Sequence, residues 1–130
     1  MFDTLFKSTT ALEKGLDASW LRGQVIANNI ANVQTVGFKT SSVEFESIFK
    51  DLLEEEGYAS GANLNDVAGL ADMQPVIVQS DDTTIRLDGN NVDIEAENAA
   101  LAKNTIYYNT LLQKLTSELD KLSIAINEGR

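Results

Sequence analysis

The last third of the chain, residues 91–130, reads NVDIEAENAALAKNTIYYNTLLQKLTSELDKLSIAINEGR and decides the fold. Its large apolar residues recur at alternating steps of four and three, a 3.5-residue repeat that is typical of a helix packed along another helix. Such a helix is roughly 45–50 Å long at 1.5 Å per residue, so it needs an equally long partner. The predicted seam consists of Tyr108, Leu112, Leu115, Leu119, Leu122 and Ile126.

Residues 4–33 show the same alternating pattern near the start of the chain, with the small residues Ser19 and Gly23 in the middle of the seam. Two long helices of similar length predict a mainly α-helical fold in which they pair as an antiparallel coiled-coil hairpin. The first helix is also apolar on a second side, and a helix apolar on two sides is normally buried between several neighbours. The residues expected there to contact other subunits are Trp20, Leu21 and Val25.

The sequence between the two helices predicts a short insertion. Residues 42–56 have an apolar stripe with acidic residues between its members, which predicts an amphipathic helix with Ser42 as its N-cap. Residues 57–73 are expected to be a loop, and the β-prone runs 74–80 and 83–87 are expected to form a small hairpin. We therefore divide the chain into one hairpin arm, an acidic middle region and a second arm, at residues 1–40, 41–90 and 91–130.

Charge is distributed unevenly along the chain, whose net charge is −10. Residues 1–40 carry four basic and three acidic side chains, residues 41–100 carry two and fourteen, and residues 101–130 carry four and three. The two ends can therefore approach other copies without strong repulsion, whereas the middle should face water or a basic partner. No basic face is available to meet phosphates, so we expect no nucleic-acid partner.

The chain contains neither Cys nor His, which removes thiol chemistry, the commonest zinc ligands and the usual general base near neutral pH. Asp81 and Asp82 are adjacent, and adjacent side chains on an extended chain point in opposite directions. We therefore expect no enzyme activity, no catalytic residues, no metal, no cofactor and no small-molecule substrate. The N-terminus also lacks a basic region followed by an apolar core, so we expect no cleavable signal peptide.

An asparagine-rich segment ends the first helix. Asn28 and Asn32 are four residues apart and share a helix face, so their amides can bond across to another helix and set its register. The other interpretation is a fraying helix end with Gly37 as the left-handed stop.

The segment Asp88–Asp93 predicts a turn followed by a helix start, in which Gly89 supplies backbone freedom and Asn91 or Asp93 is the cap. A calcium loop is the alternative, but the segment lacks the spaced ligands and the distant Glu of an EF-hand.

The first of these segments resembles the signature of bacterial flagellar rod and hook proteins, which form the axial family. The residues that carry the resemblance are Ala27, Asn28, Asn29, Ile30, Ala31, Asn32, Thr35, Gly37, Phe38 and Lys39. The second segment, together with Asn104, Tyr107 or Tyr108 and residues 125–130, is similar to the proximal rod members of that family. Val36 departs from them, since a proline often stands at this position, and the departure concerns the local turn geometry.

The resemblance implies a structural component of the flagellar basal-body rod, exported without a cleavable signal peptide and assembled helically in the periplasm to transmit torque from motor to hook. It implies as partners the chain itself, other rod proteins, the rod-base adaptor, the membrane-ring (MS-ring) protein and the flagellar type III export apparatus. It also implies an export signal at Phe2 and Phe6. The other interpretation of these two residues is that the first turn of the helix docks into its neighbour. The residues expected to pack between subunits are Trp20, Leu21, Asn28, Asn29, Asn32, Gly37, Phe38, Asp88, Gly89, Asn90, Asn91 and Asp93.

A second hypothesis fits the acidity and the coiled-coil seam. It describes a cytosolic, acidic helical adaptor or secretion chaperone that acts as a soluble dimer. Such a protein would remain inside the cell and would need no rod motif.

Overall fold

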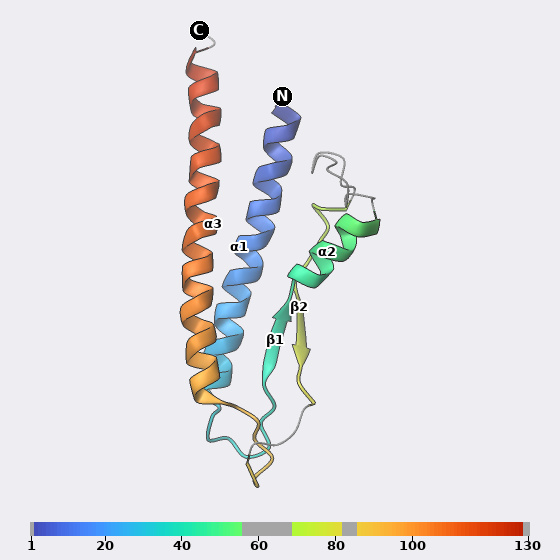
Figure 1. Ribbon diagram of the computed structural model, residues 1–130, viewed down its shortest axis with the longest axis vertical. Helices are drawn as coiled ribbons and strands as arrows, with labels where there is room; N and C mark the ends of the chain where they lie inside the picture. Colours follow the sequence, from blue (N-terminus) through green and yellow to red (C-terminus); the bar gives the residue numbers. More distant parts are fainter. Residues whose placement is uncertain (1, 56–68, 82–85, 129–130) are drawn as a thin grey trace.

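The protein is a hairpin of two long helices. The computed structural model describes residues 2–55, 69–81 and 86–128. Helix α1 (Phe2–Ala31) and helix α3 (Ile94–Glu128) run antiparallel and side by side, with the start of α1 and the end of α3 at the same end of the molecule (Figure 1). The predicted mainly α-helical hairpin is therefore confirmed.

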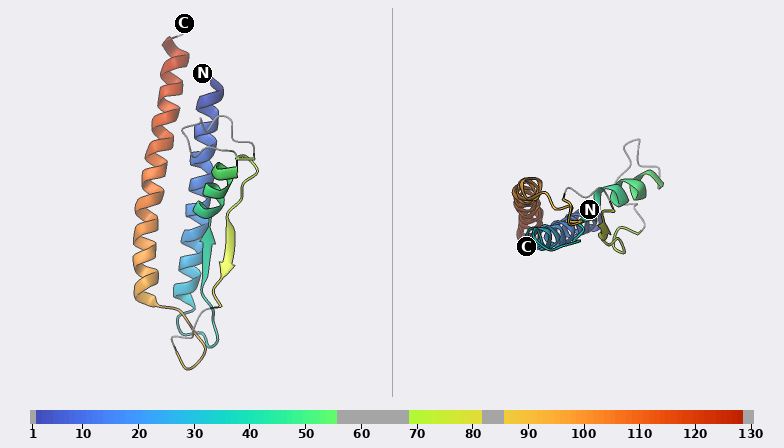
Figure 2. Two further views of the ribbon diagram at one scale, coloured as in Figure 1. Left: turned by 45° about the vertical axis from the view of Figure 1, so that its right-hand side comes forward. Right: turned by 90° about the horizontal axis from the view of Figure 1, so that it is seen from below.

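A small insertion covers α1 on the side away from α3 (Figure 2). It contains strand β1 (Ser41–Glu44), helix α2 (Glu46–Glu55) and strand β2 (Val76–Gln79). The strands pair antiparallel, with Ser41 opposite Gln79 and Glu44 opposite Val76. Because α1 packs against both α3 and β1, it is the central layer of the fold.

The structure corrects two predictions about this insertion. Ser42 is not a helix cap but lies in β1, because Val43 and Phe45 are buried at alternate positions and this two-residue period favours a strand. The run 74–80 does supply a strand, but that strand pairs with β1 rather than with 83–87. Residues 83–85 lie outside the described part of the chain, and Arg86 and Leu87 lie in a bend and a turn.

The apolar core lies between α1 and the insertion. It centres on Ala18, Phe45 and Met73, and the rings of Phe45 and Phe49 stack with their centroids 6.1 Å apart. Val25 is also buried, at 8% exposure, so its predicted role in contacting other subunits is wrong. The subunit itself covers this side chain.

The seam between α1 and α3 differs from the predicted one at alternate positions. Leu112, Leu119 and Ile126 are 44%, 51% and 58% exposed, whereas Tyr108, Leu115 and Leu122 are half-buried as predicted. The side chains that alternate with this half-buried set are Asn104, Leu111 and Glu118.

A buried polar pair explains the displacement. Ser19 Oγ donates to Asn104 Oδ1 at 3.0 Å, and Asn104 Nδ2 donates to the Ser19 carbonyl oxygen at 2.9 Å. Each of these buried polar groups needs the other as its hydrogen-bond partner, so α3 must be rotated with Asn104 toward α1. Leu111 and Glu118, at steps of seven residues from Asn104, then lie on the same side of α3. Gly23 lies beside the pair, and a Cβ there would stand 3.4 Å from Asn104 Nδ2.

We predict that Asn104→Ala lowers the free energy of unfolding by about 1–3 kcal/mol, because it removes both bonds and leaves the Ser19 hydroxyl buried without this partner. Urea denaturation followed by far-UV circular dichroism measures the change. Asn109→Ala is the matched control, since Asn109 is exposed on the same helix. Equal stabilities of the two variants would contradict the assigned role of the pair.

Candidate functional site

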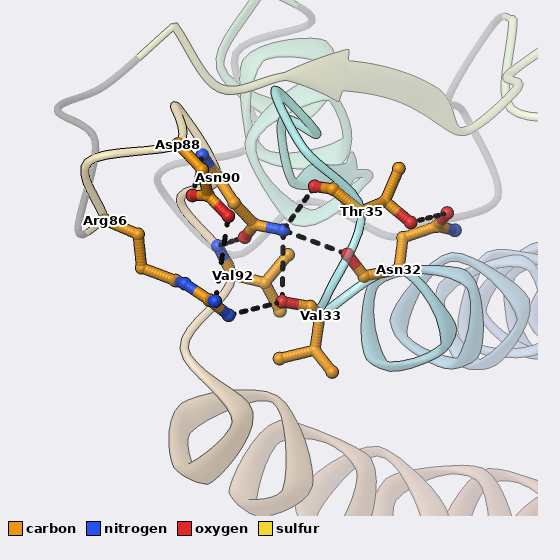
Figure 3. A network of polar contacts seen from close by, with 7 residues as sticks. All are labelled: Asn32, Val33, Thr35, Arg86, Asp88, Asn90 and Val92. Atoms are coloured by element: carbon orange, nitrogen blue, oxygen red, sulfur yellow. Dashed lines mark hydrogen bonds and ion pairs between the residues drawn. The ribbon is translucent and has the colours of Figure 1, made fainter.

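Three buried asparagines, Asn29, Asn90 and Asn91, join the elements at the closed end of the hairpin, and we call them the asparagine junction. Their exposures are 1%, 0% and 8%. Asn90 donates through its side-chain nitrogen to the carbonyl oxygens of Asn32 at 3.0 Å, Val33 at 3.1 Å and Thr35 at 2.8 Å (Figure 3). These carbonyl oxygens lie just beyond the end of α1, where the helix supplies no backbone N–H groups to them. The side chain of Asn90 supplies hydrogen-bond donors to them instead.

The turn that carries Asn90 holds this side chain in position. Asp88 accepts a hydrogen bond from the Asn90 backbone nitrogen at 3.1 Å, and Asn90 Oδ1 accepts one from the Val92 nitrogen at 2.8 Å (Figure 3). Gly89 has a φ of +84° and Gly37 a φ of +71°, a left-handed conformation that favours glycine. The Gly37 nitrogen donates to the Asp88 carbonyl oxygen at 2.9 Å, which ties the two glycine turns together.

The other two asparagines attach the small sheet. Asn29 bonds both backbone groups of Ser41, donating to its oxygen at 2.8 Å and accepting from its nitrogen at 3.0 Å, and it also donates to Glu97 of α3 at 3.1 Å. Asn91 accepts from the Thr40 nitrogen at 2.7 Å and donates to the Ser80 oxygen at 3.5 Å. One junction therefore connects both helices with both strands.

This arrangement brings the two sequence motifs together inside one subunit. Asn29, Asn90 and Asn91 were expected to pack between subunits, but their side chains are buried within the subunit. Within the subunit, Asn28 and Asn32 do not bridge to another helix: Asn28 is exposed, and Asn32 Nδ2 bonds the Asn28 oxygen at 2.8 Å. A periodic signal for Asn29 was present in the sequence, because it continues the face of α1 that includes Ala18, Arg22 and Val25.

The remaining predicted site residues lie at the edge of the junction. Phe38 is half-buried, as are Asp88 and Gly89, whereas Gly37 is exposed. Of the two predicted caps, Asn91 and Asp93, it is Asp93 that caps α3, since its Oδ1 accepts from the backbone nitrogens of Glu95 at 3.0 Å and Ala96 at 3.1 Å.

Large apolar side chains remain uncovered on the hairpin. Trp20 is 59% exposed, and Leu21 is half-buried. Ala18 and Arg22 contact the insertion, and Trp20 is two residues from each, about 200° around the helix, so it points away from the insertion. We call four of the exposed apolar side chains of the hairpin the outer face: Trp20, Leu112, Leu119 and Ile126. The other exposed large apolar side chains of the two helices are Phe6, Ile94, Ile106, Tyr107 and Ile124.

An apolar groove lies on the other flank of α3. It has a volume of about 340 Å³ and is walled by α1, α2 and α3. A second cleft of about 670 Å³ continues it past Tyr107 and Glu46, which line both. The apolar and small residues of the groove are Ala11, Leu12, Gly15, Phe45, Phe49, Tyr107 and Leu111.

Ion pairs line the groove at two places. Arg22 bonds Glu46 at 2.6 Å where the two clefts meet. Burial raises the pKa of Glu46, but the hydrogen bond from Arg22 and the charges of Arg22 and Lys103 outweigh this and hold the pKa below 4.5. Hydrogen bonds from Lys121 and Lys114 likewise lower the pKa of Glu118.

The described residues offer little for other site chemistry. No group of three or more Asp, Glu, His or Cys residues among them is arranged to hold a metal ion. No helix in residues 2–55, 69–81 and 86–128 is both long and apolar enough to cross a membrane. The features that distinguish this molecule are therefore the asparagine junction, the outer face and the groove.

We predict that Arg22→Gln raises the pKa of Glu46 toward 4.5, measured by NMR titration of the side-chain carboxyl. Since the folded-state pKa of Glu46 is lowered, its stabilising contribution is present above pH 4.5 and is lost as the pH falls through the folded-state value. The variant should therefore lose less stability on acidification. Lys50→Gln is the control, because Lys50 pairs with Glu54 and should leave Glu46 unchanged.

We predict that Asn90→Ala lowers the free energy of unfolding by about 2–3 kcal/mol, since three carbonyl oxygens lose the same donor. Asn90→Asp should cost at least as much, because a carboxylate would face those oxygens. Asn28→Ala is the control at an exposed position. Denaturant unfolding of the three variants tests this, and an Asn90→Ala variant as stable as the parent would contradict the assigned role.

Comparison with known proteins identifies the family of the chain. The model of the family described as "Flagella basal body rod protein" matches residues 14–39, which include Asn29. The flagellar basal body rod protein FlgB of Bacillus subtilis is 32% identical over 98% of this chain and 99% of its own length. FlgB of Borreliella burgdorferi is 36% identical over 74% of this chain and 78% of its own length.

Other axial proteins match a shorter part of the chain. The flagellar basal-body rod protein FlgG of Caulobacter vibrioides is 42% identical over 39% of this chain and 20% of its own length. The matches to FlgB, in contrast, cover most of both chains. The chain therefore belongs to the FlgB family of flagellar basal body rod proteins, and its role is that of a structural component of the rod.

Proposed function

We propose that this chain is exported through the flagellar type III apparatus and assembles helically, with copies of itself and with other rod proteins, into the proximal rod. The rod then transmits torque from the motor to the hook. The observation that carries this proposal is the outer face, which presents four large apolar side chains to solvent in the single subunit. Exposed apolar patches of this kind mark protein–protein contact sites.

The internal bonding of the subunit supports a role in carrying torque. Torque on a rod built of helical hairpins tends to slide one helix along the other. The Ser19–Asn104 pair opposes sliding in the middle of the hairpin, and the asparagine junction opposes it at the closed end. A subunit held at two separated points transmits shear without changing register.

Export requires a chain that can be unfolded and threaded. The sequence has no cysteine, so no disulfide has to be broken before passage. Phe6, one of the two predicted export-signal residues, is 58% exposed in the first turns of α1. The side chain of Phe2 lies outside the described residues. An exposed aromatic residue near the N-terminus is available to the export apparatus, in keeping with the predicted signal.

The insertion supplies a surface of a different character. Acidic residues that include Glu44, Asp51 and Asp72 are exposed on it. We assign this surface to contacts with the rod-base adaptor, the membrane-ring protein or the next rod protein, because like charge keeps it away from the insertions of sister copies.

We predict that deletion of the gene removes the rod and leaves the membrane ring intact in electron micrographs of basal bodies. Restoring the parent chain should restore the rod, whereas Trp20→Glu should not, because a carboxylate would be buried in a subunit contact. Leu87→Glu is the matched control, since Leu87 is fully exposed but lies outside the hairpin. Rods that persist after deletion would contradict the proposed function.

The same strains separate this proposal from a cytosolic adaptor. A rod subunit sediments with purified basal bodies in cell fractionation. A chain that remains entirely in the cytosolic fraction of flagellated cells would support the adaptor instead.

A further inference from the structure

The groove and the exposed part of α3 lie on opposite flanks of the same hairpin. Leu111 and Glu118 line the groove, and Leu112 and Leu119 each follow one residue later, about 100° around the helix. We call Leu112, Leu119 and Ile126 the outer stripe. Because groove and stripe of one molecule point in different directions, a molecule cannot fill its own groove.

We propose that the groove of one copy receives the outer stripe of α3 from a second copy, so that copies join head to tail. The inference rests on the proposed function, which requires subunits to assemble, and it names the two surfaces that meet. A contact between two different patches is heterologous, and repeating it extends a filament instead of closing a dimer.

The groove and the cleft that continues it are together long enough for the outer stripe. Along α3, the two clefts extend from Ala100 to Glu118, which corresponds to roughly 27 Å at 1.5 Å per residue, and the groove itself extends from Tyr107 to Glu118. The outer stripe extends from Leu112 to Ile126, roughly 21 Å on the same scale. Its members are seven residues apart, so they form one row on one side of a helix, and an apolar row of this kind suits a groove walled by helices. The small residues Gly15 and Ala11 add little side-chain bulk to the α1 wall of the groove.

Charge also favours a sister hairpin as the occupant. Residues 101–128 hold three basic and three acidic side chains, and residues 2–31 likewise hold three of each. These two segments, which include the α1 and α3 walls of the groove and the whole outer stripe, are therefore neutral, although the whole chain carries −10. The complete hairpin carries −2, because Glu95 and Glu97 lie in the first turn of α3. Two copies can approach through the two neutral segments without net repulsion, while their acidic insertions remain apart.

The composition of the two α3 seams explains why a partner is needed. Inside the subunit, α3 alternates its half-buried apolar residues with Asn104 and Glu118, which are polar. The outer stripe is entirely apolar and yet exposed. The stripe is only three side chains long, and small interfaces are weak, so we expect single pairs to be weak and an extended assembly to hold them together.

Cross-linking of the purified full chain at high concentration tests the inference, because the chain has no cysteine of its own. Ala11→Cys in the groove is combined in turn with Leu112→Cys, Leu119→Cys or Ile126→Cys and treated with a short bismaleimide. The stripe positions are about 10.5 Å apart, so one of them should come within reach of Ala11. We expect that double variant to give a ladder of oligomers.

The controls distinguish head-to-tail contact from other arrangements. A mixture of the two single-cysteine chains should give dimers only, and Leu87→Cys combined with Leu119→Cys should give no ladder. Three results would overturn the inference: self-cross-linking of a single stripe variant, a ladder in the Leu87 control, or no ladder in any pair. Far-UV circular dichroism of each variant verifies that it is folded.

A test in cells separates this inference from the proposed function. Ala11→Glu and Leu119→Glu should each reduce the number of complete rods about tenfold or more, because each buries a carboxylate in the contact. Normal rods in both variants, with no rods after gene deletion, would overturn the groove contact and leave the proposed function standing. Rods that persist after deletion would overturn the proposed function itself.

Discussion

The rest of the structure depends on the pairing of Ser19 with Asn104 inside the hairpin. Both groups are buried and each satisfies the other, so α3 can adopt only the rotation and register that bring them together. This one constraint turns Leu111 and Glu118 toward the groove side and leaves Leu112, Leu119 and Ile126 in solvent. The subunit thus uses a partly polar seam for its own folding and leaves the apolar row of Leu112, Leu119 and Ile126 exposed. That division is what an assembling subunit requires.

The asparagine junction is a second constraint, at the closed end of the hairpin. A single side chain, Asn90, supplies donors to three carbonyl oxygens that follow α1, and Asn29 bonds the backbone of β1 in the manner of a strand neighbour. Asn29, from the motif that carries the family resemblance, therefore closes the subunit together with Asn90 and Asn91. They orient the helices and leave the exposed helix faces uncovered. Other residues of the motif, among them Asn28 and Gly37, are exposed.

Much of the architecture was predictable from residue spacing. The two seams at alternating steps of four and three predicted the paired helices, Asp93 predicted the start of α3, and the β-prone run at 74–80 predicted a strand. The pairing of that strand with β1 was not predictable, because it depends on Asn29 holding Ser41 against α1 across the chain. Val25 was wrongly assigned to other subunits, because the pattern alone does not show that the insertion covers one side of α1. Asn104 was singled out in the sequence only by the family resemblance. The spacing of apolar residues did not indicate it, because a single polar residue in a seam forms no periodic pattern.

The sequence by itself determined the class of the fold, the charge contrast between the nearly neutral ends of the chain and its acidic middle, and the family. These follow from the types of residues and their spacing, which are local properties of the chain. Only the tertiary structure decided which row of leucines the subunit buries. Leu111 and Leu112 are equally apolar and adjacent, so hydrophobicity does not choose between them. Hydrogen bonds between residues far apart in the sequence decide which row is buried, and these bonds form only when the two helices pack together.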